Sequence, residues 1–222
     1  MLGISRRGTV YGTLLNHRDA LAALGDALHA PPYKAPPSAP VLYIKPRNTW
    51  VADGDAVVVP AGVDELEIGA TLGLVIGRTA CKVAASEALD CVAGCVIVCD
   101  VCVPHASVYR PSLRYRARDT FCPIGAFVPL AEAGAPDAVQ LAVAIDGEVV
   151  QRVSLRDLVR GPAALLAGIS AFMTLAPGDV LTLGVAAGAP RARAGQRVSI
   201  SAAGFETLSN PLVAEAPQRE AA

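Results

Sequence analysis

LEIGATLGLVIG, residues 66–77, has the alternation of apolar with small or polar residues that is typical of a β-strand. One face of this strand is apolar and consists of Leu66, Ile68, Ala70, Leu72, Leu74 and Ile76. The opposite face consists of Glu67, Gly69, Thr71 and Gly73. Because successive side chains of a strand point to opposite faces, the apolar face must pack on a core. The small residues of the other face leave room for a ligand or another backbone.

The chain around this stretch contains further predicted strands and a few predicted helices. Asp146-Gly147 lies between two alternating segments and is a strong hairpin signal. The predicted strands are 8–16, 41–45, 95–103, 139–145, 148–154, 180–184 and 197–202, and the predicted helices are 21–28, 85–93 and 162–173. This content indicates a mainly β fold, closer to a β-roll or barrel than to alternating strand–helix units. We expect a single domain over 1–213 and a disordered tail over 214–222.

The composition excludes several functional classes. The net charge is −1, whereas a general nucleic-acid binder needs clustered positive charge, so we expect no nucleic-acid partner. No apolar run is long enough to span a bilayer, and the start, MLGISRRG, does not resemble a signal peptide. We therefore expect a cytoplasmic protein without a membrane partner. The chain also has neither a common glycine-rich phosphate loop nor a G-x-S-x-G nucleophile motif.

Cysteine is concentrated in one apolar segment. Four of the six cysteines lie between residues 91 and 102, and a chain without a secretion signal more often keeps such cysteines reduced and buried. Cys99, Cys102 and His105 form a C-x2-C-x2-H run, but the second ligand pair of a typical zinc site is missing. On a strand, Cys99 and Cys102 also point to opposite faces. Buried small side chains are therefore favoured over a zinc site.

Asp100 lies inside the apolar run CVIVCDVCV, residues 95–103. A lone carboxylate is costly to bury, so Asp100 needs a metal, a cation or several hydrogen-bond donors, unless its face of the strand is exposed. We favour a site role over a purely structural salt bridge, since buried charges are normally paired. His17 follows the first predicted strand and is either a proton-transfer group or, more commonly for a loop histidine, a surface residue.

Positive charge is concentrated in two places. Lys45 and Arg47 flank Pro46 directly after a predicted strand, and Arg116 is the middle of three alternating arginines in the irregular segment 104–125. Two such cations facing one pocket would bind a small dianion, because both side chains pair well with carboxylates. The alternative is a solvated basic loop, since long charged side chains mostly stay exposed.

Six segments in a fixed order resemble the fumarylacetoacetate hydrolase family. They are YIKPRNT (43–49), LGLVIGRTACKV (72–83), GCVIVCDV (94–101), RYRARDTFCPIG (114–125), LAPGDVLTLG (175–184) and GFETLSNPLV (204–213). The resemblance implies the family's β-roll fold and a Mg²⁺ or Mn²⁺ ion that chelates a 2-oxo acid. It also implies enolate chemistry, as decarboxylation, isomerisation or hydrolysis.

The resemblance assigns roles to individual positions of this chain. Lys45 matches the family's first pocket lysine, Asp100 matches its third metal ligand, and Arg116 stands at its loop lysine. The rest of the family's loop pattern is matched by Asp119, Phe121, Pro123 and Gly125. We therefore expect catalytic roles for Lys45, Asp100 and Asp119. We expect substrate contacts from Lys45, Arg47, Thr71 and Arg116.

Two expected metal ligands are missing. The family's Glu-x-Glu positions fall on Gly69 and Thr71, which leaves Asp100 as the single anionic ligand. Glu65 and Glu67 form a Glu-x-Glu four residues earlier, about 13 Å away at ~3.3 Å per residue, and a register shift or bulge would be needed to bring them in. Two further departures are Ala20 at the lid histidine position and Leu183-Gly184-Val185-Ala186 at the usual T-G-T-P turn. The chain alone is therefore not expected to hold a complete metal site.

Within the family these losses are similar to those of the amino-terminal half of the bifunctional isomerase/decarboxylases of 4-hydroxyphenylacetate degradation. The resemblance implies isomerisation of 2-hydroxyhepta-2,4-diene-1,7-dioate or decarboxylation of 5-oxopent-3-ene-1,2,5-tricarboxylate, both small anionic dicarboxylate-type substrates. The implied partner is a homologous metal-competent subunit, or a second copy in a homodimer. Two alternatives remain open: a non-catalytic structural or regulatory half, and a metal-free tautomerase or decarboxylase that uses Lys45 and Asp100.

Overall fold

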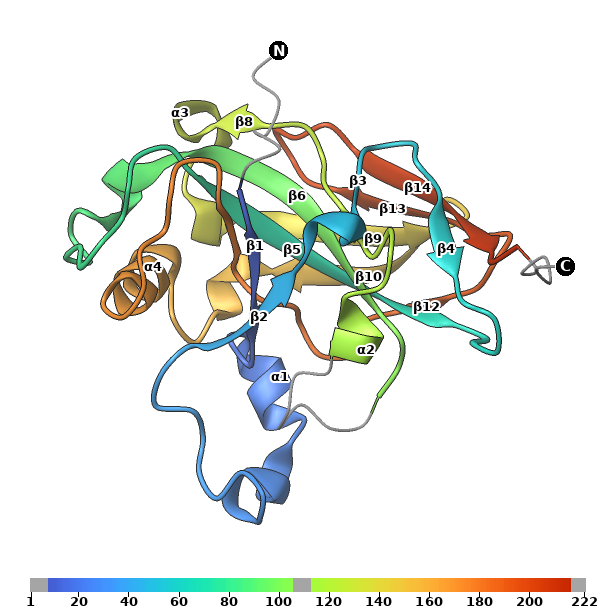
Figure 1. Cartoon of the computed structure of the whole chain (residues 1–222), viewed down its shortest axis with the longest axis horizontal. Helices are drawn as coiled ribbons and strands as arrows, with labels where there is room; N and C mark the ends of the chain where they lie inside the picture. The colour runs from blue at the N-terminus through green and yellow to red at the C-terminus, as the bar shows by residue number, and fades with distance from the viewer. Residues whose placement is uncertain (1–7, 106–112, 217–222) are drawn as a thin grey trace, which may run out of the picture.

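The computed structural model describes residues 8–105 and 113–216, and its fold is mainly β with short helices, as predicted (Figure 1). The larger sheet has the strand order β2-β1-β11-β5-β6-β8, with β12 paired to β5. Its strands are β1 (Val10–Leu14), β2 (Val41–Lys45), β5 (Leu66–Ile76), β6 (Val92–Cys102), β8 (Val128–Pro129), β11 (Val180–Thr182) and β12 (Arg191–Ala192).

The second sheet has five strands in the order β10-β9-β13-β14-β4. They are β4 (Val57–Val59), β9 (Gln140–Ile145), β10 (Glu148–Ser154), β13 (Arg197–Ser201) and β14 (Leu208–Ala214). Asp146-Gly147 connects β9 to the antiparallel β10, so the predicted hairpin is confirmed. A short parallel pair joins β3 (Trp50–Val51) to β7 (Cys122–Pro123).

The strands β5 and β6 form a long antiparallel pair through the centre of the molecule (Figure 1). In this ladder Glu67 is opposite Cys102 and Gly69 is opposite Asp100. The only irregularity of the pair lies between Val75 and Ile76, at the far end of β5. Asp100 therefore shares a face of the sheet with Glu67 and Gly69, because directly opposed residues point to the same side.

The predicted apolar face of β5 is the centre of the core. Its residues Leu66, Ile68, Ala70, Leu72, Leu74 and Ile76 are at most 1% exposed. The five-stranded sheet packs on this face through Leu141, Val143, Val198, Ile200, Leu208 and Leu212. The helix α4 (Pro162–Ser170) adds Leu165, Leu166 and Ile169 to the same core. A smaller cluster covers part of the other face with Val10, Val96, Val98, Cys122 and Val180.

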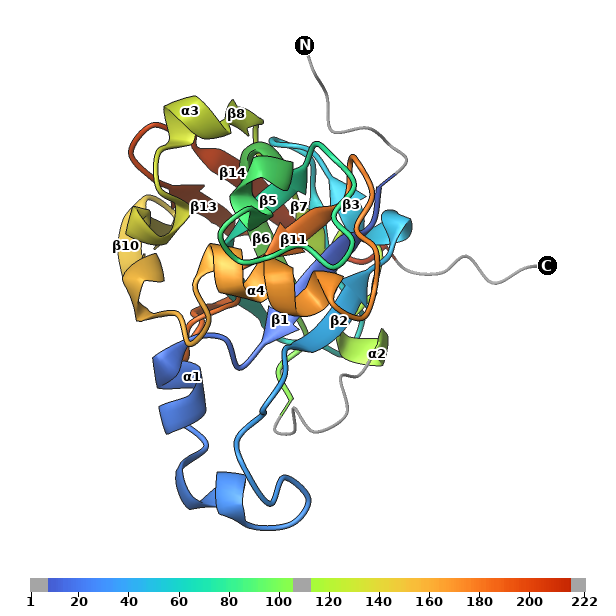
Figure 2. The same cartoon turned by 90° about the vertical axis from the view of Figure 1, so that its left-hand side faces the viewer.

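The remaining helices are short and lie in the connections. They are α1 (Arg18–Ala22), α2 (Leu113–Arg116) and α3 (Leu130–Ala133), with 3-10 turns η1 (Gly25–His29), η2 (Arg47–Thr49), η3 (Ala88–Cys91), η4 (Pro136–Ala138) and η5 (Leu155–Asp157). The segment from α1 to β2 extends away from the two sheets, as Figure 2 shows. Among the described residues, no helix has the length and apolar character needed to cross a membrane.

Two predicted elements were wrong. The predicted helix 85–93 is only the four-residue turn η3, because the Cys91 carbonyl accepts from the amides of Gly77 and Arg78 and β6 already begins at Val92. The strand near 197–202 is not the last, since β14 follows it although Pro211 argues against a strand there. Pairing with β13 on one side and β4 on the other outweighs that local preference.

Element ends also differ from the predictions by a few residues. The predicted strand 8–16 is β1 (Val10–Leu14), and the predicted helix 162–173 ends at Ser170. At the carboxyl end β14 includes Ala214, and the Glu215 side chain accepts a hydrogen bond from the Ala61 amide at 2.7 Å. The ordered chain thus continues past the predicted boundary at 213, and 217–222 lie outside the described residues.

Candidate active site

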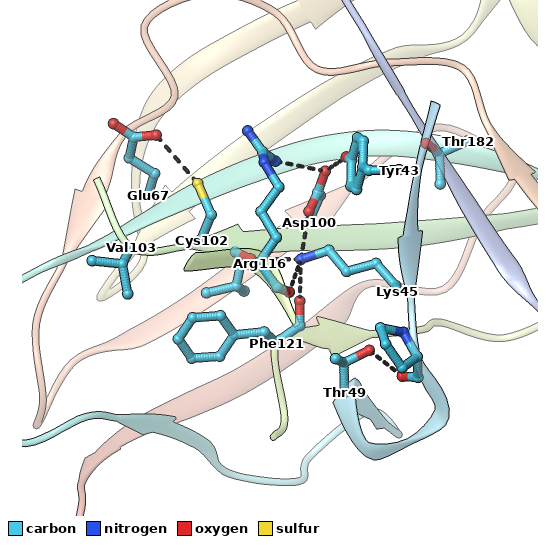
Figure 3. Close-up of polar contacts among 12 residues, drawn as sticks. Tyr43, Lys45, Thr49, Glu67, Asp100, Cys102, Val103, Arg116, Phe121 and Thr182 are labelled. Carbon is cyan, nitrogen blue, oxygen red and sulfur yellow. Dashed lines mark hydrogen bonds and ion pairs between the residues drawn. The ribbon is translucent and has the colours of Figure 1, made fainter. Parts of the chain in front are cut away.

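Asp100 is the centre of a buried charge cluster between β6 and β2. Lys45 is the last residue of β2, and its Nζ lies 2.7 Å from Asp100 Oδ1 (Figure 3). The side chains of Lys45 and Asp100 are 1% and 2% exposed. Burial of a carboxylate without such a cation would be strongly unfavourable. The sequence prediction that Asp100 needs a partner is therefore confirmed, and the partner is an ammonium group.

Lys45 is fixed by backbone carbonyls as well as by Asp100. Its Nζ donates to the carbonyls of Val101 at 2.6 Å, Arg116 at 3.0 Å and Phe121 at 3.0 Å. An ammonium group has three N–H donors, so these carbonyls and Asp100 more than satisfy it. Burial lowers the pKa of Lys45 to about 8, because the charged form loses its hydration.

Tyr43 and Arg116 complete the surroundings of Asp100. Tyr43 lies two residues before Lys45 on the same face of β2, and its hydroxyl donates to Asp100 Oδ2. The tyrosine ring lies across Gly12 of β1, where a Cβ atom would stand only 2.1 Å from the ring. Arg116 Nη1 is 3.6 Å from Oδ2, and its guanidinium stacks 4.8 Å above the Tyr43 ring.

The charge state of Asp100 reflects two opposing effects. Burial raises its pKa to about 6, while the Arg116 guanidinium opposes that rise. Two cations, Lys45 and Arg116, face one carboxylate, so this cluster has a net positive charge when all three are ionised. Such a cluster can attract an anion and can also hold a proton-accepting group near neutral pH.

A cavity of about 450 Å³ opens beside this cluster. One part of its lining is apolar and comes from Leu14, Leu15, Ala20, Ala23, Leu24, Val185, Ala186, Ala187 and Ala189. The polar part consists of Thr13, Tyr43, Glu67, Asp100, Cys102, His105, Arg116 and Arg191. A mostly apolar pocket with a few convergent polar groups is typical of a small-molecule site, and this volume suits a small organic acid.

The structure brings three of the six predicted site residues together at the cavity. Asp100 and Arg116 line the cavity, and Lys45 lies directly behind Asp100. Arg47 is exposed in η2 and Thr71 is fully buried, and neither lines the cavity. Asp119 is exposed as well, and its carboxylate accepts from Asn48 Nδ2 at 2.7 Å. It therefore ties its loop to the turn after β2.

A hard metal ion does not fit the residues of this site. A Cβ atom on Gly69 would stand 2.8 Å from the Asp100 carbonyl oxygen and 2.9 Å from Val185 Cγ2, so these two groups occupy the space that a carboxylate side chain needs. Both Asp100 oxygens already face donors or cations, and Thr71 offers only a hydroxyl. Within the described ranges, no three His, Cys, Asp or Glu side chains gather closely enough to hold a metal ion.

The glutamates that precede these positions do not replace the missing ligands. Glu65 is ion-paired with Arg193 at 3.4 Å, away from the cavity. Glu67 lines the cavity but is paired with Arg191 at 3.5 Å and accepts from Cys102 Sγ at 3.4 Å. The ladder from Glu67 to Asp100 is regular, so the register shift that could have brought these glutamates into the site is absent there.

Sequence reasoning missed several cavity residues and misplaced one histidine. Tyr43 could have been found, because it shares a strand face with Lys45 two residues away. Arg191 belongs to β12, which pairs with β5 far along the chain, and no local signal indicated it. His17 is 3% exposed rather than at the surface, and its Nδ1 lies 2.5 Å from Asp19 Oδ1.

The cysteine segment is arranged as the alternation predicted. Cys99 is opposite Ala70 and Cys102 is opposite Glu67, so the two thiols lie on opposite faces of the sheet. All six cysteines are free, and burial raises the pKa of both Cys99 and Cys102 to about 12. Cys102 therefore faces the cavity as a neutral thiol and not as a thiolate nucleophile.

Comparison with known proteins identifies relatives along nearly the whole chain. The family model described as fumarylacetoacetate (FAA) hydrolase C-terminal matches residues 9–213. The 4-hydroxyphenylacetate degradation bifunctional isomerase/decarboxylase of Escherichia coli is 40% identical over 209 residues, which cover 94% of this chain and 48% of that protein. The chain thus spans about half the length of that protein and of two other curated bifunctional isomerase/decarboxylases that it matches.

Solved structures give the same assignment. 5-Carboxymethyl-2-hydroxymuconate delta-isomerase from Mycobacterium smegmatis superposes with a TM-score of 0.78 at 28% identity, covering 95% of this chain and 80% of that one. 2-Hydroxyhepta-2,4-diene-1,7-dioate isomerase from Mycobacterium marinum gives a TM-score of 0.75 at 26% identity, covering 95% and 76%. The chain therefore belongs to the fumarylacetoacetate hydrolase family, and it is related to the isomerase/decarboxylases of 4-hydroxyphenylacetate degradation.

Proposed function

We propose that this chain is the substrate-binding, metal-free half of an isomerase/decarboxylase of 4-hydroxyphenylacetate catabolism, acting together with a homologous metal-competent chain. The observation that carries the proposal is the carboxylate of Asp100, held between Lys45, Tyr43 and Arg116 at the wall of a small-molecule cavity. The substrate class is an unsaturated 2-oxo or 2-hydroxy dicarboxylate such as 2-hydroxyhepta-2,4-diene-1,7-dioate or 5-oxopent-3-ene-1,2,5-tricarboxylate. Support comes from the 40% identity to a bifunctional enzyme of that pathway.

The residues divide into binding and proton-transfer roles. Arg116 and Arg191 both line the cavity, and their guanidinium groups are suited to the two carboxylates of the substrate. A keto–enol shift needs a positioned base and acid near their working pH, and Asp100 with a pKa of about 6 suits the base. Tyr43 donates to the same carboxylate and can carry the proton between it and the substrate. Lys45 is a positioning residue, because it lies behind Asp100 and does not line the cavity.

The need for a partner chain is inferred from the metal ligands that this chain lacks. Gly69, Thr71 and Val185 do not form a metal site, whereas the bifunctional relatives are about twice as long and have a second half. A homologous chain with the glutamates in place would contribute the metal-dependent part of the reaction. A homodimer is the alternative assembly, and it would limit the activity to what Asp100 and Tyr43 can do alone.

Exchanging Asp100 for asparagine tests this function. We expect kcat/KM of the assembled two-chain complex for 2-hydroxyhepta-2,4-diene-1,7-dioate to fall by ~10²–10³-fold, since a general base contributes about that much. The matched control is Asp90→Asn, an exposed aspartate outside the cavity, which leaves kcat/KM unchanged. The measurement is turnover by the chain alone, the partner alone and the mixture. If Asp100→Asn leaves the complex fully active, this chain is the non-catalytic structural half instead.

The activity is expected to have a bell-shaped pH profile. Below about pH 6, Asp100 gains a proton and no longer acts as a base, so kcat/KM falls toward acid. Above about pH 8, Lys45 loses its proton and no longer neutralises Asp100, so kcat/KM falls toward alkali. The two limbs belong to the coupled pair and not to either residue alone. The check is kcat/KM across that range, and a flat profile from well below 6 to well above 8 contradicts this assignment.

A further inference from the structure

Two nitrogen atoms at the cavity have no hydrogen-bond partner among the described residues. They are His105 Nε2 and Arg116 Nε, and both atoms are buried. Buried polar groups are nearly always hydrogen-bonded, so each unpaired one needs an explanation, such as a bound ligand. Both residues line the same cavity, and the acid–base cluster uses neither atom.

The side chain of His105 is fixed in one orientation. Its Nδ1 lies 2.9 Å from the Val103 carbonyl, and the ring stacks on Tyr115 with centroids 5.1 Å apart and planes inclined by 24°. The Val103 amide in turn donates to the Tyr115 carbonyl at 3.0 Å, which ties α2 to the end of β6. A carbonyl oxygen can only accept, so Nδ1 carries the hydrogen. The neutral ring therefore offers a bare acceptor at Nε2.

The two unpaired atoms require opposite partners. Arg116 Nε carries a hydrogen and needs an acceptor, such as a carboxylate oxygen. His105 Nε2 needs a donor, such as a hydroxyl group. Of the two tautomers of a 2-oxo acid, the enol has a hydroxyl donor next to its carboxylate, whereas the keto form has only acceptors there.

We propose that His105 and Arg116 together recognise the 2-hydroxy (enol) form of the substrate, with the carboxylate at Arg116 Nε and the enol hydroxyl at His105 Nε2. This inference rests on the proposed function for the dicarboxylate and adds which tautomer the cavity selects. The keto form places a carbonyl oxygen against the lone pair of Nε2, and both groups then stay buried without a hydrogen bond. Such a mismatch weakens binding, because buried polar groups without partners lose their hydration and gain no hydrogen bond in return.

The test is calorimetric binding to the full-length chain, above neutral pH, of three six-carbon dicarboxylates. 2-Hydroxymuconate (2-hydroxyhexa-2,4-dienedioate) has the enol hydroxyl, trans,trans-muconate lacks it, and 2-oxoadipate has a keto oxygen there. We expect the wild-type chain to bind 2-hydroxymuconate about tenfold more tightly than either of the others, the range for one hydrogen bond to a buried group.

The informative variant is His105→Phe, which keeps an aromatic ring against Tyr115 and removes the Nε2 acceptor together with the Nδ1 hydrogen bond to the Val103 carbonyl. Its affinity for 2-hydroxymuconate should fall to that for muconate, while muconate binding stays within about twofold. His29→Phe, at an exposed histidine of η1, is the matched control and retains the preference. Partial recovery of the preference in His105→Gln, whose amide oxygen is an acceptor, further supports the assignment.

The outcomes separate this inference from the proposed function. Equal binding of the three acids by the wild-type chain, or an unchanged preference in His105→Phe, overturns the enol recognition and leaves a dicarboxylate site intact. In that case His105 Nε2 faces only water. Failure of all three acids to bind overturns the dicarboxylate site and, with it, the enol recognition.

Discussion

Replacing Lys45 with methionine is expected to lower the free energy of unfolding by about 3–5 kcal/mol, because removal of one partner leaves a buried charge uncompensated. Methionine has a similar length and fills the same space. Asp100 then keeps only Arg116 at 3.6 Å as a cationic neighbour, and the hydrogen bonds from Nζ to the carbonyls of Val101, Arg116 and Phe121 are lost. The measurement is urea unfolding at neutral pH with an unchanged m-value.

Two further variants separate the ion pair from other effects of the substitution. Lys82→Met, at an exposed lysine, should change the free energy of unfolding by no more than ~0.5 kcal/mol. The double variant Lys45→Met/Asp100→Asn should be more stable than Lys45→Met by about 1–3 kcal/mol, because the uncompensated carboxylate is gone. A Lys45→Met chain as stable as the wild type would mean that Asp100 does not depend on this ammonium group.

The sequence was enough to predict that the Asp100 carboxylate has a compensating partner. A carboxylate within CVIVCDVCV needs a compensating group wherever it lies. The observed ladder then places it opposite Gly69. The sequence alone could not tell whether that group was a metal or a cation. The answer depends on how β2 lies relative to β6, which the register of the three intervening strands β1, β11 and β5 sets and no local pattern encodes.

The predicted roles of Arg47 and Thr71 illustrate the limits of sequence proximity. Arg47 is only two residues from Lys45, but β2 ends between them and η2 turns its side chain to solvent. Thr71 is on the correct face of β5, yet it is fully buried beyond the cavity. The closure of the space beside Gly69 also depends on Val185, which comes from a distant loop. Contacts between distant segments therefore decided which predicted residues meet at the site.

Restoring the two missing carboxylates beside Asp100 should convert a chain that does not bind Mn²⁺ into one that does. The wild-type chain is expected to show no calorimetric heat and no shift of Tm with Mn²⁺, since Asp100 is the single carboxylate at the three expected ligand positions and already faces Lys45. The variant Gly69→Glu/Thr71→Glu/Val185→Gly restores two carboxylates and removes the side chain that blocks position 69. Gly69 does not have a positive φ, so its dihedral angles allow glutamate, but a Cβ atom there would stand 2.8 Å from the Asp100 carbonyl oxygen, so β6 has to shift slightly to admit it.

The metal should stabilise this triple variant by mass action. At a Mn²⁺ concentration of about 100 times Kd, the stabilisation is ~2.7 kcal/mol, which a Tm measurement detects readily. The control Gly69→Gln/Thr71→Gln/Val185→Gly has nearly the same shape without the charges and should not respond. Gly69→Glu alone should be destabilised by ~2–3 kcal/mol, because the new side chain meets Val185 and buries an unpaired carboxylate. Tight Mn²⁺ binding by the wild-type chain contradicts this account, because it requires a metal site that Gly69, Thr71 and Asp100 do not form.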